Sequence, residues 1–175
     1  MKHLLFFLLL LPVAGQSQTL YEPFEIRMVD TSSGSKKELY NRVRTWVNKF
    51  YHTNKEVIVS EDLDSGRIVG KGSMMYPTRN LIGMTVCDAA ISYIITIEVK
   101  NGRYRGILSD FRHNGCFNGK EDTPTGGLLV NDKPAGHLSK RQWASIKAEA
   151  AENGIAVLRS LSQFMRNEAE KHADW

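Results

Sequence analysis

The stretch ISYIITIEVKNGRYRGILSDF, residues 91–111, decides the fold. Asn101 and Gly102 stand between two runs in which apolar and polar residues alternate, as expected of strands with one buried face. A two-residue turn of this kind needs a positive φ at both positions, which Asn and Gly tolerate. The pattern therefore predicts a β-hairpin in which Lys100 lies opposite Arg103.

One face of this hairpin is the candidate binding surface. If the helices cover the opposite face, a choice that the sequence leaves open, Ile94, Ile107 and Phe111 leave this face unusually apolar. Exposed apolar patches often mark partner sites. The alternative is that residues 114–138 fold over it. The predicted binding residues are Ile94, Thr96, Glu98, Arg103, Arg105 and Ile107, with Ser92 on the same face.

The same register sets Glu98 opposite Arg105 and, further down the hairpin, brings Cys87 opposite Cys116, the only two cysteines in the sequence. An exported protein can oxidise such a pair, so a disulfide is expected if the register holds. A single β-bulge near Asp110 would move the two thiols out of line.

Two helices are predicted from their starting residues. Ser35 with Glu38, and Ser139 with Gln142, have the spacing of a capping box, and apolar residues then recur every three or four positions. If continuous, the second helix would exceed the width of a small domain at about 1.5 Å per residue. We expect it either to kink near Gly154 or to overhang, and an overhang would offer a homo-oligomer contact.

Three further strands are expected at residues 24–29, 56–61 and 67–75. In the last of these, Gly70 and Gly72 leave one face without side chains. Either the strand bends there or another element, such as the long helix, packs closely against it, and bending is favoured. The order of elements predicts an α+β fold, β-α-β-β-β-β-α, with helices on one face of a curved antiparallel sheet.

The N-terminal residues have the pattern of an export signal. A basic start at Lys2 is followed by the apolar run 4–11 and by small residues up to Ser17. The run is too short to span a bilayer, so no transmembrane anchor is expected in the mature chain. Residues 1–17 are therefore predicted to be a signal peptide that directs the protein to the periplasm or the extracellular space.

The remaining chain has the length of one domain. We expect an α+β domain at residues 18–113 and a loop or flap at 114–138, either with a short edge strand or forming a site. A C-terminal helix at 139–175 would pack on the domain or extend from it.

Residues 24–113 resemble a known family. The stretches FEIRMVDTSSGSKKELYNRVRTWVNKFY, VIVSEDLDSGRIVGKGS and ISYIITIEVKNGRYRGILSDF are similar to the family called domain of unknown function 4468, which occurs in exported proteins of Bacteroidetes. The resemblance implies a TBP-like fold. It supplies no catalytic residues, and a shared fold does not transfer DNA binding.

Charge patterning argues against a nucleic-acid partner. The formal net charge is +4, and acidic and basic residues are mixed along the chain. The closest approach to a basic patch is the set Arg103, Arg105 and Arg112, which can equally solvate one side of a strand. No spacing of metal ligands or cofactor-binding residues is present, so neither a metal nor a cofactor is expected.

Asp110, His113 and Cys116 form the only candidate catalytic set. A histidine can hold a thiolate and a carboxylate can orient the histidine, but strand periodicity sends Asp110 and His113 to opposite faces. The sequence therefore favours a non-catalytic binding or structural module of the cell envelope, with an envelope protein or a small ligand as partner. The alternative is an envelope hydrolase or thiol enzyme that uses these three residues.

Overall fold

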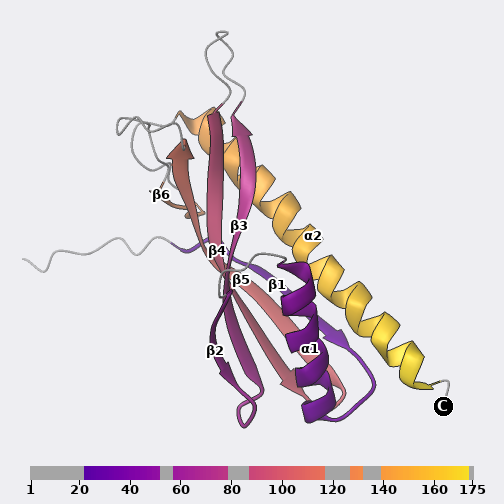
Figure 1. The fold of residues 1–175 in the computed structure, drawn as a ribbon. Coiled ribbons are helices and arrows are strands. Elements are labelled where there is room, and N and C mark those ends of the chain that lie inside the picture. Colours follow the sequence, from indigo (N-terminus) through magenta and orange to yellow (C-terminus); the bar gives the residue numbers. More distant parts are fainter. Residues whose placement is uncertain (1–21, 52–56, 79–86, 117–126, 132–138, 174–175) are drawn as a thin grey trace, which may run out of the picture.

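In a computed structural model, two helices pack on one face of an antiparallel sheet (Figure 1). The structure describes residues 22–51, 57–78, 87–116, 127–131 and 139–173, so the predicted signal peptide lies outside the described residues. The elements are β1 (Ile26–Thr31), α1 (Lys36–Phe50), β2 (Ile58–Asp62), β3 (Arg67–Thr78), β4 (Cys87–Lys100), β5 (Arg103–Cys116), β6 (Gly127–Leu128) and α2 (Lys140–Ala173).

The sheet has the strand order β1-β5-β4-β3-β2, and all of its pairs are antiparallel. The short strand β6 comes from the expected flap and pairs with β5 at Arg112 and His113, beyond the part of β5 that β1 covers. The predicted α+β fold with helices on one face of the sheet is therefore confirmed, with one strand more than expected. Residues 117–126 and 132–138 of the flap lie outside the described residues.

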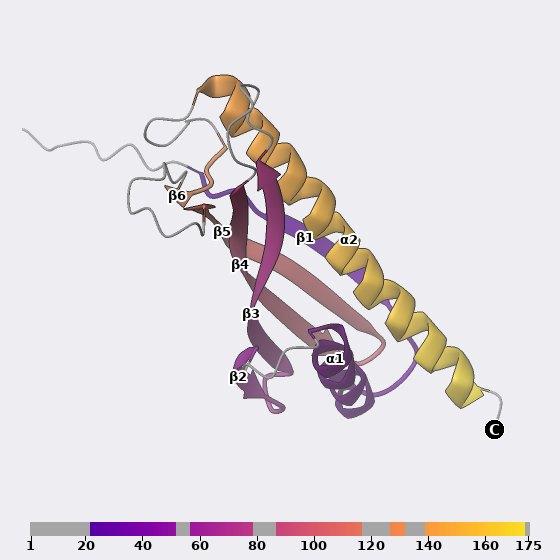
Figure 2. The ribbon, with the colours of Figure 1, turned by 45° about the horizontal axis from the view of Figure 1, so that its top comes forward.

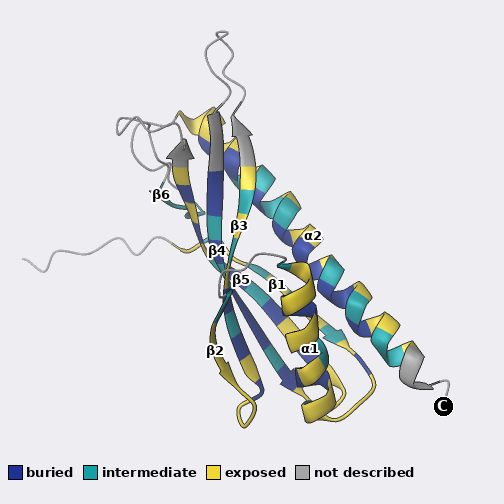
Figure 3. Ribbon diagram, in the orientation of Figure 1, coloured by how far each residue is buried: buried dark blue, intermediate teal, exposed yellow. Residues whose placement is uncertain are grey.

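The helices begin where their capping boxes predict. Ser35 Oγ accepts a hydrogen bond from the amide of Glu38, whose carboxylate accepts from the amide of Ser35 at 2.7 Å. Ser139 and Gln142 make the same exchange at the start of α2, with distances of 3.0 and 3.2 Å. Figures 2 and 3 show both helices on the same side of the twisted sheet, with their buried residues turned toward it.

The core lies between the helices and this face of the sheet. Alternate residues of β4 point into it, and they pack with one stripe of each helix because strand side chains alternate between faces. The buried apolar residues include Leu39, Val43, Trp46 and Val47 from α1, Ile91, Tyr93, Ile95, Ile97 and Val99 from β4, and Ile146, Leu158, Leu161 and Met165 from α2.

The second helix is continuous, so the kink considered at Gly154 is not present. Gly154 lies in close contact with the sheet: a β-carbon there would meet Ile26, Leu108 and Phe111. At about 1.5 Å per residue the helix is roughly 50 Å long, and its C-terminal turns reach beyond the end of β1 (Figures 1 and 2). The predicted homo-oligomer contact through α2 stays a prediction. Among the described residues no helix is both long and apolar enough to cross a membrane.

The hairpin has the predicted register near its turn and departs from it further away. Pairing runs as expected from Lys100 opposite Arg103 to Ile94 opposite Ser109. Ser92 then lies opposite Arg112, which leaves an extra residue on β5 in a bulge where Asp110 has a φ of 51°. The prediction that Phe111 lies on the open face is wrong, because the bulge returns it to the helix side, where it is fully buried.

A second irregularity follows at Ala89, which lies opposite Cys116, whereas Cys87 is paired with Thr78 of β3. The predicted alignment of the two cysteines is therefore wrong, for the physical reason that two bulges lengthen β5 relative to β4. The side chains of Cys87 and Cys116 lie outside the described part of the chain, so the disulfide itself stays a prediction that non-reducing mass spectrometry can test.

The two glycines of β3 permit close packing, which the sequence offered as the alternative to a bend. β3 pairs with β4 without a register shift from Arg67 to Thr78. A β-carbon on Gly70 would lie 3.2 Å from the carbonyl oxygen of Val57, and one on Gly72 would meet the ring of Tyr93. The neighbours that require the glycines are therefore a residue before β2 and an aromatic ring of β4, and the long helix is not among them.

Candidate functional site

The open sheet face is the surface of the sheet turned away from both helices. The six predicted binding residues share it, because the odd-numbered residues 91–99 of β4 point into the core and directly opposed residues share a face. No described element covers this face. We define the open sheet face by Arg27 and Val29 of β1, Arg103, Arg105, Ile107 and Arg112 of β5, Ser92, Ile94, Thr96, Glu98 and Lys100 of β4, and Arg67, Val69, Lys71, Ser73 and Met75 of β3.

The open sheet face carries apolar side chains in contact with solvent. Ile94, Ile107 and Val69 are half-buried in its middle. Val29 is 71% exposed and Met75, which lies opposite Ala90, is 60% exposed. Large apolar side chains at these exposures are costly to solvate, which is typical of a surface that contacts a partner.

A shallow pocket of about 290 Å³ lies at the turn end of the open sheet face. Sequence reasoning missed three of its lining residues, Val29, Lys100 and Tyr104. Lys100 lies two residues after Glu98 on the same strand and therefore points to the same face, so the alternation of side chains along β4 could have predicted it. Val29 belongs to β1, and its place opposite Arg105 depends on a strand pairing that the local pattern does not encode. The lining residues are Val29, Glu98, Lys100, Arg103, Tyr104 and Arg105.

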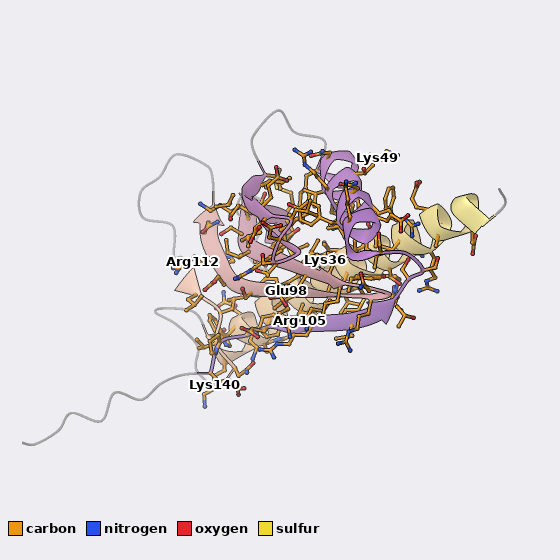
Figure 4. The ribbon with its side chains drawn as sticks, turned by 90° about the horizontal axis from the view of Figure 1, so that it is seen from below. Lys36, Lys49, Glu98, Arg105, Arg112 and Lys140 are labelled. Atoms are coloured by element: carbon orange, nitrogen blue, oxygen red, sulfur yellow. The ribbon has the colours of Figure 1, made fainter. Side chains whose placement is uncertain are left out.

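One ion pair organises the charges of the pocket. A single carboxylate oxygen of Glu98 accepts from Arg105 Nε at 2.7 Å and lies 2.6 Å from Arg105 Nη2 (Figure 4). On its other side Glu98 lies opposite Arg67 of β3. This ion pair fixes the guanidinium of Arg105 beside Glu98. The pocket still has more positive than negative side chains.

Lys100 and Arg103 are directly opposed and exposed, and both project from the open sheet face. Directly opposed residues have β-carbons about 5 Å apart, and like charges at this spacing repel. Within the described ranges, neither side chain has a hydrogen bond or an ion pair. The pocket therefore holds two cations that no carboxylate of the described chain neutralises.

On the opposite side of the sheet, a polar cluster fixes α2 to β1 beside the pocket. Asp30 accepts hydrogen bonds from Ser162 Oγ at 2.6 Å and from the Tyr104 hydroxyl at 3.2 Å. The bond from Ser162 holds the pKa of Asp30 below its usual range, and burial raises the pKa of Tyr104 to about 12. Arg166 donates to Ser162 at 2.7 Å, so the cluster is satisfied internally and serves packing.

The candidate catalytic set is not assembled among the described side chains. Asp110 is exposed at the bulge, whereas His113 is buried and lies opposite Ile91 on the helix side. Burial lowers the pKa of His113. The side chain of Cys116 lies outside the described residues. Elsewhere in the described ranges, no group of three or more His, Cys, Asp or Glu residues is placed to hold a metal ion.

A second depression lies between the helices. It has a volume of about 450 Å³ and is lined by Glu38, Asn41, Arg42, Thr45 and Glu168. Arg42 is engaged there, because its guanidinium donates to the carbonyl of Ser33 at 2.8 Å. This depression mixes charges of both signs and has no apolar lining residue, so it offers weaker grounds for a site than the open sheet face.

Comparison with known proteins gives a family and a fold. The family described as a domain of unknown function (DUF4468) with TBP-like fold matches residues 27–114. A crystal structure of a DUF4468 family protein from Bacteroides ovatus is similar to the chain with a TM-score of 0.60 at 16% identity, covering 81% of this chain and 85% of that one.

A TBP-like protein from Parabacteroides distasonis gives a TM-score of 0.56 at 15% identity, covering 79% of this chain and 92% of that one. Both likenesses extend beyond the family match, but at these identities they establish the fold alone. No curated protein sequence matches the chain.

Proposed function

The chain belongs to the DUF4468 family with a TBP-like fold, and from this premise we propose that it is an exported, non-catalytic binding module of the bacterial cell envelope. The observation that carries the proposal is the open sheet face. It joins solvent-exposed apolar side chains to a pocket lined by three cations, and no described element covers it. A face that served only to close the core would not need this combination.

Export is supported by residues 1–17, whose basic start, apolar run and small residues follow the order of a secretory signal. The expected result is that the protein recovered from the periplasm or medium of an expressing bacterium lacks these residues. Intact-mass measurement of the exported protein tests this. Recovery of the full-length chain in the cytoplasm alone would contradict export.

A non-catalytic role is supported by the placement of the ionisable groups. The carboxylate of Asp110 is exposed at the bulge, whereas the imidazole of His113 is buried, so these two members of the candidate set lie in different environments. On the open sheet face, the carboxylate of Glu98 is engaged by Arg105 and has no nucleophile or base among its hydrogen-bond partners. Binding needs only the charges and apolar contacts that are present.

Ligand mapping by NMR tests the proposed function. The ¹⁵N-labelled exported protein is titrated in turn with peptidoglycan fragments, an acidic polysaccharide, an acidic peptide and vesicles of anionic phospholipid. The expected result is saturable shift changes that cluster at Thr96, Ile107 and their neighbours on the open sheet face. Changes confined to α1 and α2, or none with any ligand, would contradict it.

Two variants sharpen this experiment. Ile107→Asn removes apolar surface from the middle of the open sheet face and should weaken binding. Ala156→Asn introduces the same side chain at an exposed position of α2 and should leave binding unchanged. Thermal unfolding of both variants checks that any loss of binding is not a loss of fold.

A further inference from the structure

We infer that the pocket at the turn end of the open sheet face binds the phosphate group of an organic phosphate monoester. Lys100, Arg103 and Arg105 would hold the phosphate, and Val29 would contact the organic part. The inference rests on the proposed binding function of this face and names the chemistry of its ligand.

The charge of the pocket matches a phosphate monoester. Three cations line it against the single carboxylate of Glu98, which leaves two positive charges. A phosphate monoester carries about −1.5 to −2 at pH 7. A carboxylate ligand would supply one negative charge and leave the pocket positive, so the dianion is the better complement.

Lys100 and Arg103 supply an independent reason. They repel each other across the strand pair, and no carboxylate of the described chain relieves this repulsion. The nearest acid on this face, Glu98, is already engaged by Arg105. A bound dianion between Lys100 and Arg103 would convert the repulsion into two charge-assisted contacts.

The donor geometry suits phosphate. Arginine presents a planar set of N–H groups that matches the oxygens of a phosphate. The contacts of Arg105 with Glu98 use Nε and Nη2, which leaves Nη1 for a ligand, and the guanidinium of Arg103 is wholly uncommitted within the described part of the chain. Glu98 thereby positions one arginine while the other stays free to engage the anion.

Val29 favours an organic monoester over inorganic phosphate. It lies opposite Arg105 and is 71% exposed, so it forms an apolar wall beside the cations. Contact with the carbon atoms of a ligand would remove this apolar area from water. A soluble sugar or glycerol phosphate and a lipid phosphate both supply such carbon atoms.

Calorimetric titration of the exported protein tests the inference. The probes are glycerol 3-phosphate, glycerol, sulfate, and phosphatidylcholine vesicles with and without phosphatidate. Glycerol 3-phosphate should bind and glycerol should not, while sulfate should bind more weakly because it lacks the organic part. Binding of free glycerol 3-phosphate assigns a soluble ligand, and binding of phosphatidate vesicles alone assigns a lipid; either result supports the inference.

Three substitutions localise the site. Arg103→Gln and Lys100→Gln should each weaken phosphate binding at least about tenfold, because each removes a charge-assisted contact. Arg112→Gln is the matched control: Arg112 is exposed on the same face, opposite Ser92, at the far end from the pocket. It should leave binding unchanged.

Equal weakening by all three substitutions would overturn the inference, since it would mean that general positive charge attracts any polyanion. Tighter binding of an oligonucleotide than of glycerol 3-phosphate would overturn it as well. Absence of phosphate binding, combined with NMR shifts at Thr96 and Ile107 for another ligand, would overturn this inference while the proposed function stands. Absence of any binding on the open sheet face would overturn both.

Discussion

Tyr93 of β4 lies over Gly72, its directly opposed partner on β3: a β-carbon on Gly72 would come within 2.5 Å of the Tyr93 hydroxyl oxygen. The same hydroxyl lies 2.9 Å from that of Tyr51, which follows α1. The missing side chain at position 72 thus lets the aromatic ring cross β3 and join the sheet to the end of the helix. This packing fixes the end of α1 to the face of the sheet that the helices cover.

Gly72→Ala should therefore destabilise the protein. The added methyl group cannot coexist with the tyrosine ring in its present position, and forced repacking of a close-packed core costs about 1–3 kcal/mol. The measurement is the free energy of unfolding in urea, followed by circular dichroism. Ser73→Ala, at the exposed next position of β3, is the control and should change stability little.

The cause can be isolated with a double-mutant cycle. If the methyl group acts through Tyr93, Gly72→Ala should cost much less in a Tyr93→Ala background. An undiminished cost in that background would mean that the alanine disturbs the strand itself.

Asp110 should tolerate glycine better than a β-branched residue. Its φ of 51° lies in the left-handed region, which costs about 1–2 kcal/mol for most side chains and nothing for glycine. We expect Asp110→Gly to leave the free energy of unfolding within about 0.5 kcal/mol of the wild type, and Asp110→Val to lower it by about 1–2 kcal/mol.

Arg112→Val is the control for Asp110→Val, because Arg112 is an exposed residue of β5 that follows the bulge. It should be close to neutral, because valine favours extended backbone. Equal effects at the two positions would show that the bulge does not constrain residue 110.

Gly154→Val should be the most damaging substitution on α2. The valine side chain would enter the contact with Ile26, Leu108 and Phe111, where even a β-carbon is crowded. A loss of at least about 2 kcal/mol is expected, although valine has a higher helix propensity than glycine. Ala156 lies on the exposed side of the same helix. Ala156→Val measures how much a β-branched residue lowers the free energy of unfolding where the helix does not contact the sheet. Similar losses for both variants would rule out the packing explanation.

Local patterns were sufficient for the elements and insufficient where distant strands meet. Asn101 and Gly102 determine the turn, and Ser35 and Ser139 mark the helix starts, because each acts on residues within a few positions. The face of Phe111 could not be predicted, since the bulge at Asp110 depends on how β5 meets its neighbours and not on its own alternation.

The pocket residues also divide into those that the local sequence predicts and those that depend on contacts between distant strands. Glu98, Arg103 and Arg105 follow from the hairpin register alone, and they form half of the pocket lining. Val29 could not be placed, because β1 joins β5 across more than seventy residues of sequence. The neighbour of Gly72 could not be identified for a related reason: the ring that it accommodates belongs to another strand, and a glycine that permits close approach has the same local pattern as one that permits a bend.

His113 should make the protein less stable as the pH falls below neutrality. Its side chain is buried, and burial lowers its pKa from the ordinary value of 6.5. Between the folded pKa and 6.5 the unfolded chain therefore binds more protons than the folded one, so the free energy of unfolding decreases as the pH falls through this window and levels off below the folded pKa. Its slope from this group cannot exceed about 1.4 kcal/mol per pH unit.

Urea unfolding between pH 7.5 and 5 measures this effect, and His113→Gln removes the titrating imidazole while keeping a polar side chain. The variant should lose the part of the slope that His113 contributes, so the stability difference between wild type and variant should itself shrink or change sign as the pH falls. Asp30 does not interfere, because its lowered pKa places its own loss of stability below about pH 4. Parallel curves for the two proteins would mean that His113 takes up its proton equally well in the folded state, and its burial would then have no electrostatic consequence.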